Sequence, residues 1–183
     1  PMAFVNIIKG CDKFCSYCIV PFTRGREKSR RLAEVVTDVK RLVEYSGIQE
    51  VISVGESSFL YSPENRRHNI VTGLKKLNGI LIPKDGIFSF NKALGPVTAT
   101  TGYKKELVIK GDVTVPDFGG GLCQVSTTVY RGAWEYGLPI TQRSNHSYIV
   151  RYYAPIGTDA TVFAPGVDMR FLNNTSGAIL LQT

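Results

Sequence analysis

The sequence predicts an α+β protein in two unlike parts: one βαβ unit, followed by a mainly antiparallel region built around one central helix. Over residues 1–55, strand, helix and strand character follow one another. After Gly79, short apolar runs alternate with Pro, Gly and Asn turns, and a single stretch with helical spacing interrupts them. The 183 residues, 43% hydrophobic and 20% charged, suit one folded domain or a domain with an appendage.

Each element of the βαβ unit has its own signal. Residues 3–8, AFVNII, combine β-branched and aromatic side chains as buried strands do. Pro21 and Gly25 then interrupt regular structure. A helix that ends at Gly47 is predicted by apolar residues at positions 32, 35, 36, 39, 42 and 43. IQEVISVG, residues 48–55, predicts the second strand of the unit.

The second part begins with a helix from about Pro63 to Asn78, with proline at its first turn. A further helix, CQVSTTVYRGAWEYG at residues 123–137, has apolar residues four positions apart and ends at Gly137. Short strands are expected at ILIP (80–83), GIFSF (86–90), ELVIKGDVTV (106–115), HSYIVRYY (146–153), TDATVF (158–163), VDMRFL (167–172) and AILLQT (178–183). These elements predict an antiparallel arrangement and not a continuation of the βαβ unit.

The net charge of +7 is unevenly distributed, and TRGREKSRR at residues 23–31 contributes much of the excess in the N-terminal part. Such a patch either binds phosphate groups or is a solvated basic loop, and both interpretations stay open. No apolar run approaches the roughly 20 residues of a membrane-spanning helix. The first residues also lack the pattern of a secretory signal. We therefore expect no transmembrane segment in this chain.

Three of the four cysteines, Cys11, Cys15 and Cys18, form a Cys-x3-Cys-x2-Cys pattern. Thiolates so close together suit an iron–sulfur cubane, because they can bind three of its irons and leave the fourth open to a small molecule. A zinc site normally needs four ligands, and no nearby fourth is evident. Three buried thiols are the remaining alternative, since a secreted disulfide framework does not have this crowding.

The stretch GCDKFCSYCIVPFTRGREKSR, residues 10–30, resembles the cluster loop of MiaB-type tRNA methylthiotransferases, which are radical S-adenosylmethionine (SAM) enzymes. The resemblance covers about residues 1–54 and implies a fragment of that family's partial (β/α) barrel. It also implies a [4Fe–4S] cluster on Cys11, Cys15 and Cys18, SAM as a second cofactor with Tyr17 next to its adenine, and tRNA as a partner if this segment is functional. The later barrel strands have no counterpart here, so methylthiolation by this chain alone is not expected.

Residues 55–183 resemble a VanW domain, from a family named after a vancomycin (glycopeptide) resistance gene cluster. The resemblance rests on RRHNI (66–70), GIFSFNKALG (86–95), GGGLCQVSTTVYRGA (119–133), RSNHSYIVRYY (143–153) and DATVFAPGVDMRFLNNT (159–175). It implies a bacterial cell-envelope role, with peptidoglycan or its precursors as the partner, and it implies no cofactor.

Cys123 is the candidate nucleophile of this second part, because it follows three glycines and begins a helix, where free N–H groups and the helix dipole favour a thiolate. His146 opens one expected strand, and Asp159 lies near the start of the next. This is the chain order of papain-like and transglutaminase-like thiol enzymes. In a thiol hydrolase or transferase, His146 would take the thiol proton and Asp159 would fix the imidazole tautomer. Gln124 or the backbone N–H groups near Gly121 would stabilise an oxyanion.

Each of these residues also has a purely structural interpretation. Cys123 can be a small buried residue, His146 a hydrogen-bonded histidine on a packed face, and Asp159 a turn residue. A noncatalytic wall-binding module is therefore an alternative to a thiol enzyme. The RRH run at 66–68 is either an anion site or a set of surface charges.

The sequence as a whole predicts a chimeric chain, with a truncated radical SAM segment at 1–54 and a VanW domain at 55–183. The first function hypothesis is a cell-envelope module that binds or modifies peptidoglycan through the Cys–His–Asp site and that also contains a partial [4Fe–4S] segment. The alternative is a SAM-dependent tRNA methylthiotransferase of which this chain is an incomplete or fused piece. The expected location is the cytoplasm if the cluster forms, and the cell envelope if the VanW part dominates and an upstream signal was lost.

Overall fold

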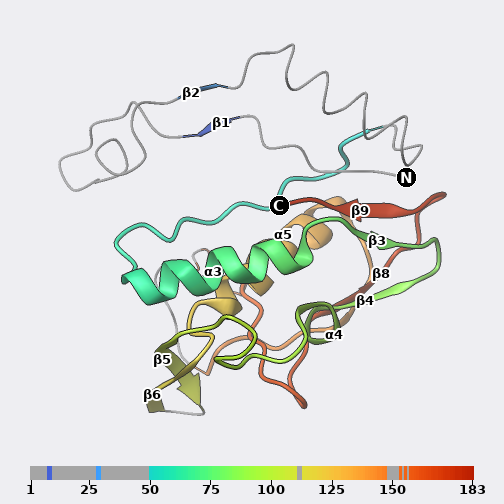
Figure 1. Cartoon of the computed structure of the whole chain (residues 1–183). Coiled ribbons are helices and arrows are strands. Elements are labelled where there is room, and N and C mark those ends of the chain that lie inside the picture. The colour runs from blue at the N-terminus through green and yellow to red at the C-terminus, as the bar shows by residue number, and fades with distance from the viewer. Residues whose placement is uncertain are drawn as a thin grey trace.

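The computed structural model (Figure 1) describes residues 8–9, 28–29, 50–110, 113–147, 153, 155 and 157–183. Within these residues the protein is a mixed helix and strand fold in which the paired strands are antiparallel, which confirms the antiparallel α+β class. Most of the expected βαβ unit and partial barrel lies outside the described residues, which in this part are residues 50–55 and a short antiparallel pair. That pair joins β1 (Ile8–Lys9) to β2 (Lys28–Ser29), and β2 falls in a stretch expected as a loop.

Helix α3 (Glu64–Leu77) confirms the first helix expected in the second part. It begins directly after Pro63, whose extended backbone precedes the first turn. Its buried residues are Asn69, Ile70, Gly73 and Leu77. A Cβ at Gly73 would lie 2.7 Å from Leu122 Cδ2, so the glycine allows α3 to pack closely against the next long helix.

Helix α5 (Leu122–Tyr136) confirms the second expected helix. Gly121 precedes it with a φ of 110°, and Gly137 ends it with a φ of 91° and donates its N–H to the Ala133 and Trp134 carbonyls. Glycine adopts these left-handed conformations without strain, which explains both ends of the helix.

Two small antiparallel sheets pack around these helices. β3 (Ile80–Ile82) pairs with β9 (Ile179–Leu181). The second sheet places β8 (Arg170–Leu172) between β4 (Ile87–Ser89) and β7 (Ile140–Gln142). β8 and β9 lie near the C-terminal end of the chain, and they pair with β4 and β3, which follow α3. Both sheets can therefore form only when nearly all residues from β3 to β9 are present.

A short helix and a ribbon complete the fold. Helix α4 (Phe90–Leu94) follows β4 directly, and the Ser89 side chain caps it by accepting the Lys92 N–H. β5 (Lys105–Lys110) and β6 (Val113–Phe118) form the ribbon. Figure 1 shows this ribbon near the start of α3 and the β3–β9 pair near its end.

One hydrophobic core lies between the helices and the strands. Phe90, Leu77 and Met169 are its largest fully buried apolar side chains. Phe88 stacks on Phe171 across β4 and β8, with ring centroids 5.0 Å apart. The core therefore draws on α3, α4, α5 and both sheets, and it fixes α5 in place.

The second strand expected at 48–55 is wrong for the residues that the structure describes. Glu50 forms a single bridge, and residues 51–59 have no regular secondary structure. The physical reason is Gly55, where a Cβ would lie 2.0 Å from the Thr128 carbonyl oxygen. This segment packs against the α5 backbone instead of pairing with a strand.

Two strands expected near the C-terminus are also wrong where they can be assessed. His146, Ser147 and Tyr153 are not in a strand, and residues 158–163 make only isolated bridges, Ser144 with Thr161 and Phe163 with Val167. Hydrogen bonds to α5 side chains replace a ladder here. β7 and α4, which were not expected, are too short to give a periodic signal of their own.

Candidate functional site

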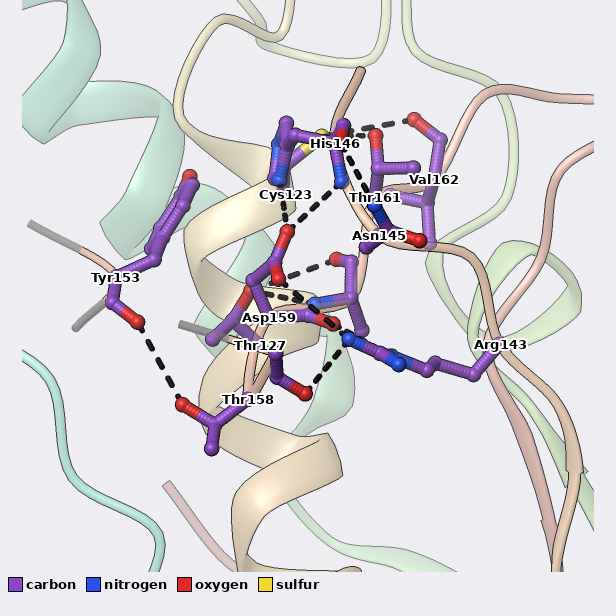
Figure 2. Close-up of polar contacts among 12 residues, drawn as sticks. Cys123, Thr127, Arg143, Asn145, His146, Tyr153, Thr158, Asp159, Thr161 and Val162 are labelled. Atoms are coloured by element: carbon purple, nitrogen blue, oxygen red, sulfur yellow. Dashed lines mark hydrogen bonds and ion pairs between the residues drawn. The ribbon is translucent and has the colours of Figure 1, made fainter. Parts of the chain in front are cut away.

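The structure brings Cys123, His146 and Asp159 together at the start of α5 (Figure 2). Cys123 is the second residue of α5, whereas His146 and Asp159 lie in loops and not in the strands expected for them. Figure 2 shows Asp159 between His146 and Arg143.

The three glycines before Leu122 form a turn that other residues would not fit. Gly119 and Gly121 have positive φ angles of 86° and 110°. Gly120 has no such angle, but a Cβ there would lie 2.6 Å from the Leu107 carbonyl oxygen. Two positions therefore need glycine for conformation and one needs it for space, and the turn leads directly into α5.

His146 is oriented by Asp159 through two hydrogen bonds. Its Nδ1 lies 2.5 Å from Asp159 Oδ2, and the same oxygen accepts the His146 backbone N–H at 2.8 Å. Because a carboxylate only accepts, we assign the proton to Nδ1, which leaves Nε2 as the basic nitrogen. Nε2 is buried and has no hydrogen-bond partner among the described residues.

Arg143 holds Asp159 from the opposite side. Its Nε donates to the Asp159 carbonyl oxygen at 2.7 Å, and its Nη2 donates to the Gly157 carbonyl oxygen at 2.8 Å and lies 3.5 Å from Asp159 Oδ1. Burial alone raises the pKa of the Asp159 carboxyl, but the hydrogen bonds from His146 outweigh it and lower the pKa below its ordinary value. Asp159 is therefore a carboxylate at neutral pH.

The ionisation of Cys123 is coupled to that of His146. Burial alone raises the pKa of the Cys123 thiol, but the neighbouring imidazole, the Val162 backbone and the Thr161 hydroxyl together lower it below its ordinary value. Burial alone lowers the pKa of His146, whereas Cys123 and Asp159 raise it overall. Both shifts favour a thiolate beside an imidazolium, the reactive form of a thiol nucleophile.

The thiol is not joined to the imidazole by a well-formed hydrogen bond in this geometry. Sγ instead lies 3.5 Å from Thr161 Oγ1 and 3.6 Å from the Val162 carbonyl oxygen. The imidazole nevertheless lies close enough to lower the pKa of the thiol, and the thiol raises the pKa of the imidazole.

Contacts with α5 keep the loop segments at the site. The Ala160 N–H donates to Thr127 Oγ1 at 3.0 Å, one helical turn beyond Cys123. The ring of Tyr153 stacks on the His146 imidazole with centroids 4.8 Å apart. Helix α5 thus carries the nucleophile and also holds the segment that supplies Asp159.

Gln124 is not brought to the thiol. Its Oε1 accepts a hydrogen bond from Arg66 at 2.8 Å, and its Nε2 donates to Ser57 Oγ at 3.2 Å. Neighbouring helix residues point about 100° apart, which directs Gln124 toward α3 and away from the thiol. In the described part of the chain no hydrogen bond is made by the Cys123 backbone N–H, so this group remains available for an oxyanion.

The RRH run at 66–68 does not form one anion site. Arg66 donates to Ser62 and Gln124, and His68 Nε2 bonds to the Gly102 carbonyl oxygen at 2.8 Å. Arg143 and Asn69 were not expected as site residues, but Arg143 donates to the Asp159 carbonyl oxygen and Asn69 donates to the Gly120 carbonyl oxygen. No local sequence signal distinguishes them, because their partners are far away in the chain.

The cluster residues expected in the N-terminal part, Cys11, Cys15 and Cys18, lie outside the described residues, as does Tyr17. Across the residues that are described, no group of three or more His, Cys, Asp or Glu side chains is placed to hold a metal ion. None of the helices in this part is long and apolar enough to cross a membrane.

A cleft of about 260 Å³ lies near the other end of α5 and does not include the thiol. It is lined by Val54, Glu56, Arg131, Trp134, Glu135, Pro155 and Thr158.

Two protein families match the chain, over ranges that overlap. The model of VanW-like proteins matches residues 65–183, and the model of the radical SAM superfamily matches residues 5–101. The overlap at 65–101 means that these matches do not settle the boundary expected at residue 54. No solved structure gives a significant match to the chain.

Relatives of both kinds are found among known proteins. The uncharacterized protein YoaR of Bacillus subtilis is 38% identical over 125 residues, which are 68% of this chain and 41% of YoaR. The tRNA-2-methylthio-N(6)-dimethylallyladenosine synthase of Lawsonia intracellularis is 38% identical over 73 residues, which are 40% of this chain and 16% of the synthase. The mitochondrial tRNA methylthiotransferase CDK5RAP1 of Rattus norvegicus is 40% identical over 100 residues, 52% of this chain and 17% of that protein. The chain thus spans less than half the length of each of these relatives.

Proposed function

Because the chain belongs to the VanW family over residues 65–183 and to the radical SAM superfamily over residues 5–101, we propose that its VanW part is a thiol-dependent acyl-transfer module of the cell envelope. Its substrate would be a peptide of peptidoglycan or of its precursors. The choice of substrate rests on the VanW resemblance, which implies a cell-envelope role with peptidoglycan or its precursors as the partner. The reaction type rests on the residues at the start of α5.

One observation supports this function above the others: His146 has one ring nitrogen held by Asp159 and the other buried without a partner beside a cysteine whose pKa is lowered. A buried polar atom without a partner is costly, so its presence beside Cys123 argues for a role in proton transfer. A merely structural histidine would be expected to bond through both nitrogens. The arrangement matches the nucleophile, base and orienting carboxylate of thiol enzymes.

In the first half-reaction, the Cys123 thiolate would attack the carbonyl carbon of a substrate amide. An S–C bond forms, and the carbonyl π pair moves onto oxygen, where the Cys123 backbone N–H can stabilise it. When the C–N bond then breaks, the protonated Nε2 of His146 donates its proton to the leaving amine. The acyl group remains on Cys123 as a thioester.

In the second half-reaction, water or a substrate amine would attack the thioester carbonyl. Neutral His146 takes the proton from the attacking group through Nε2, and the C–S bond breaks to regenerate the thiolate. Water as the acceptor makes the module a hydrolase, and an amine makes it a transferase. Asp159 keeps the imidazole in one tautomer and stabilises its charged form throughout.

The test is to incubate the protein with purified soluble peptidoglycan fragments and to measure its mass by mass spectrometry. We expect an acyl adduct on the peptide that contains Cys123, and no adduct with Cys123→Ala. His146→Asn should slow its formation by at least about a hundredfold, the usual contribution of general acid–base catalysis. A matched control, Cys11→Ala/Cys15→Ala/Cys18→Ala, should retain the adduct.

Two results would contradict the thiol function. One is an adduct that also forms with Cys123→Ala. The other is binding to peptidoglycan that is equal in the parent and in Cys123→Ala, without any adduct or cleavage, which would leave a noncatalytic wall-binding module.

A second candidate function concerns the N-terminal segment, and the methylthiotransferase relatives favour it. Cys11, Cys15 and Cys18 supply three thiolates, the donor set that a [4Fe–4S] cluster with one open iron requires. When bound, such a cluster would supply the electron that cleaves SAM, with tRNA as the substrate class of the relatives. Tyr17 would contact the adenine. Because the chain spans a small part of these relatives, methylthiolation itself would need further protein.

This candidate is tested by anaerobic reconstitution with iron and sulfide, followed by absorption and EPR spectroscopy. We expect a cluster in the parent and in Cys123→Ala, and none in the variant without Cys11, Cys15 and Cys18. An EPR signal that changes on addition of SAM would support the SAM site. Equal spectra for the parent and the triple variant would exclude cluster binding by this segment.

A further inference from the structure

Asn69 is a polar side chain on the buried face of α3, and it has no exposure to solvent. Its Nδ2 donates to the carbonyl oxygens of Lys104 at 2.9 Å and Gly120 at 3.1 Å. Its Oδ1 accepts the Lys104 backbone N–H at 2.8 Å. Burying an amide is costly unless its groups are paired, and here both Nδ2 and Oδ1 are paired with backbone. One side chain therefore links α3, the residue before β5 and the glycine turn.

The glycine turn is also bonded to the same backbone group that Asn69 holds. The Gly119 N–H donates to the Lys104 carbonyl oxygen at 3.3 Å, and the Leu122 N–H donates to the Gly119 carbonyl oxygen at 3.0 Å. Asn69 thus contacts the turn directly at Gly120 and indirectly through Lys104. Its loss would remove both supports at once.

The turn has little space in which to move while it keeps this path. A Cβ at Gly120 would lie 2.6 Å from the Leu107 carbonyl oxygen, and one at Gly121 would lie 2.9 Å from Ile70 Cγ1. The turn is therefore pressed against β5 on one side and α3 on the other. Because α5 begins directly after this turn, a small displacement of the turn would also displace the first residues of α5.

We infer that Asn69 is a positioning residue that holds the glycine turn, and through it the Cys123 thiol, in place beside His146. Cys123 follows Gly120 by three residues, so the turn sets where α5 begins and which way its first side chains point. Asn69 touches neither the thiol nor a substrate, and it acts only through the backbone. Its role rests on the proposed function, since it matters only if Cys123 is a reactive thiol.

The experiment measures the rate at which iodoacetamide alkylates Cys123 in the full chain, as a function of pH. Mass spectrometry of the peptide that contains Cys123 separates it from the other cysteines. The variants are Asn69→Asp, which keeps the size and the acceptor but loses both donors, and Asn69→Ala. Thermal unfolding is measured in parallel for each protein.

Asn173 offers a matched control, because it is also fully buried and also bonds to backbone. Its Nδ2 donates to the carbonyl oxygens of Ile82, Pro83 and Gly177, which belong to the β3 and β9 region and not to the glycine turn. Asn173→Ala should lower thermal stability as much as Asn69→Ala without altering the alkylation profile. A general effect of destabilisation is thereby separated from positioning.

For the parent we expect the plot of alkylation rate against pH to have its inflection below about pH 8.5, which is the ordinary pKa of a cysteine thiol. In the Asn69 variants the inflection should rise by about one unit, which makes alkylation at pH well below the inflection about tenfold slower. Asn69 variants that fold and keep the parent profile would overturn the inference. Failure of both Asn69 variants to fold, while Asn173→Ala folds, would also overturn it, because Asn69 would then be a folding residue. A parent inflection at the ordinary value would contradict the proposed function itself, and the role of Asn69 with it.

Discussion

Asp159 shows at the scale of a single residue how the site is held together. Its carboxylate accepts two hydrogen bonds from His146, and its carbonyl accepts one from Arg143. The Asp159 side chain is 12% exposed and that of His146 only 2%. A carboxylate so placed can orient the imidazole with little competition from water.

The lowered pKa of Asp159 predicts a dependence of stability on acid. Since the folded-state pKa is below the unfolded value of about 4, Asp159 contributes stability above that value and loses it as the pH falls through the folded pKa. Asp159→Asn should therefore flatten the fall of the melting temperature below about pH 4. Thermal unfolding followed by circular dichroism between neutral and acid pH measures this.

Asp168 is the control for that prediction, because its pKa is lowered too, by hydrogen bonds with Arg170, Ser89 and backbone that outweigh burial. Asp168→Asn should flatten the same part of the stability curve, but it should leave the alkylation of Cys123 unchanged. Asp159→Asn should slow alkylation at neutral pH. An unchanged alkylation profile in Asp159→Asn would contradict the orienting role of the carboxylate.

At the scale of elements, α5 organises the site through more than its first turn. Thr127 is fully buried, and its hydroxyl accepts the Ala160 N–H and donates to the Ala160 carbonyl at 3.4 Å. These contacts replace the strand pairing that the TDATVF pattern predicted. The segment with Asp159 is therefore attached to a helix and not to a sheet.

Thr127→Val should destabilise the protein by about 1–3 kcal/mol, because it leaves the buried Ala160 N–H without an acceptor at nearly constant volume. Chemical denaturation measures the difference. Ser126 is a neighbouring control: it is also fully buried, but its hydroxyl has no partner among the described residues. Ser126→Ala should be neutral or stabilising, and an equal loss in the two variants would contradict the bonding role of Thr127.

The segment at 51–59 is a second element whose importance depends on α5. Ser57 Oγ lies 2.6 Å from Thr128 Oγ1 and accepts the Gln124 amide, while Gly55 lies against the helix backbone. Gly55→Ala should cost about 1–3 kcal/mol or more, because the new Cβ meets backbone that cannot rotate away. Gly166→Ala, where a Cβ would meet nothing within 4 Å, should stay within about 0.5 kcal/mol of the parent. Chemical denaturation measures both variants. If Gly55→Ala were as stable as Gly166→Ala, the segment at 51–59 would not pack on α5 in solution.

At the scale of the whole molecule, the described core is formed by residues between Ile70 and Leu181. Ile52 and Phe59 pack against it from the preceding segment. A chain that begins at residue 50 should therefore unfold cooperatively and keep the alkylation profile of Cys123. Calorimetry and alkylation of the shortened chain test this.

A chain that begins at residue 65 should be less stable, since it lacks the Ser57 and Gly55 contacts.

The sequence predicted the elements whose signals are local. α3 and α5 follow from helical spacing and from terminal glycines. The run ELVIKGDVTV was expected as one short strand, and the structure forms two paired strands there, β5 and β6. The sequence did not predict that residues 51–59 lack regular structure, because VISVG has the composition of a strand, whereas Gly55 packs against the Thr128 backbone. Local preference is overridden here by tertiary packing.

The sequence by itself therefore determined that two families meet in this chain, that Cys123 follows a glycine turn at the start of a helix, and that Cys11, Cys15 and Cys18 have the spacing of cluster ligands. Only the tertiary structure decided which residues surround the thiol. It set His146 and Asp159 in loops beside Cys123, turned Gln124 away toward Arg66, and bonded Asn69 to the glycine turn and Arg143 to Asp159. The physical reason is that hydrogen bonds and close packing between segments distant in sequence fix these side chains, and no local pattern of residues encodes such contacts.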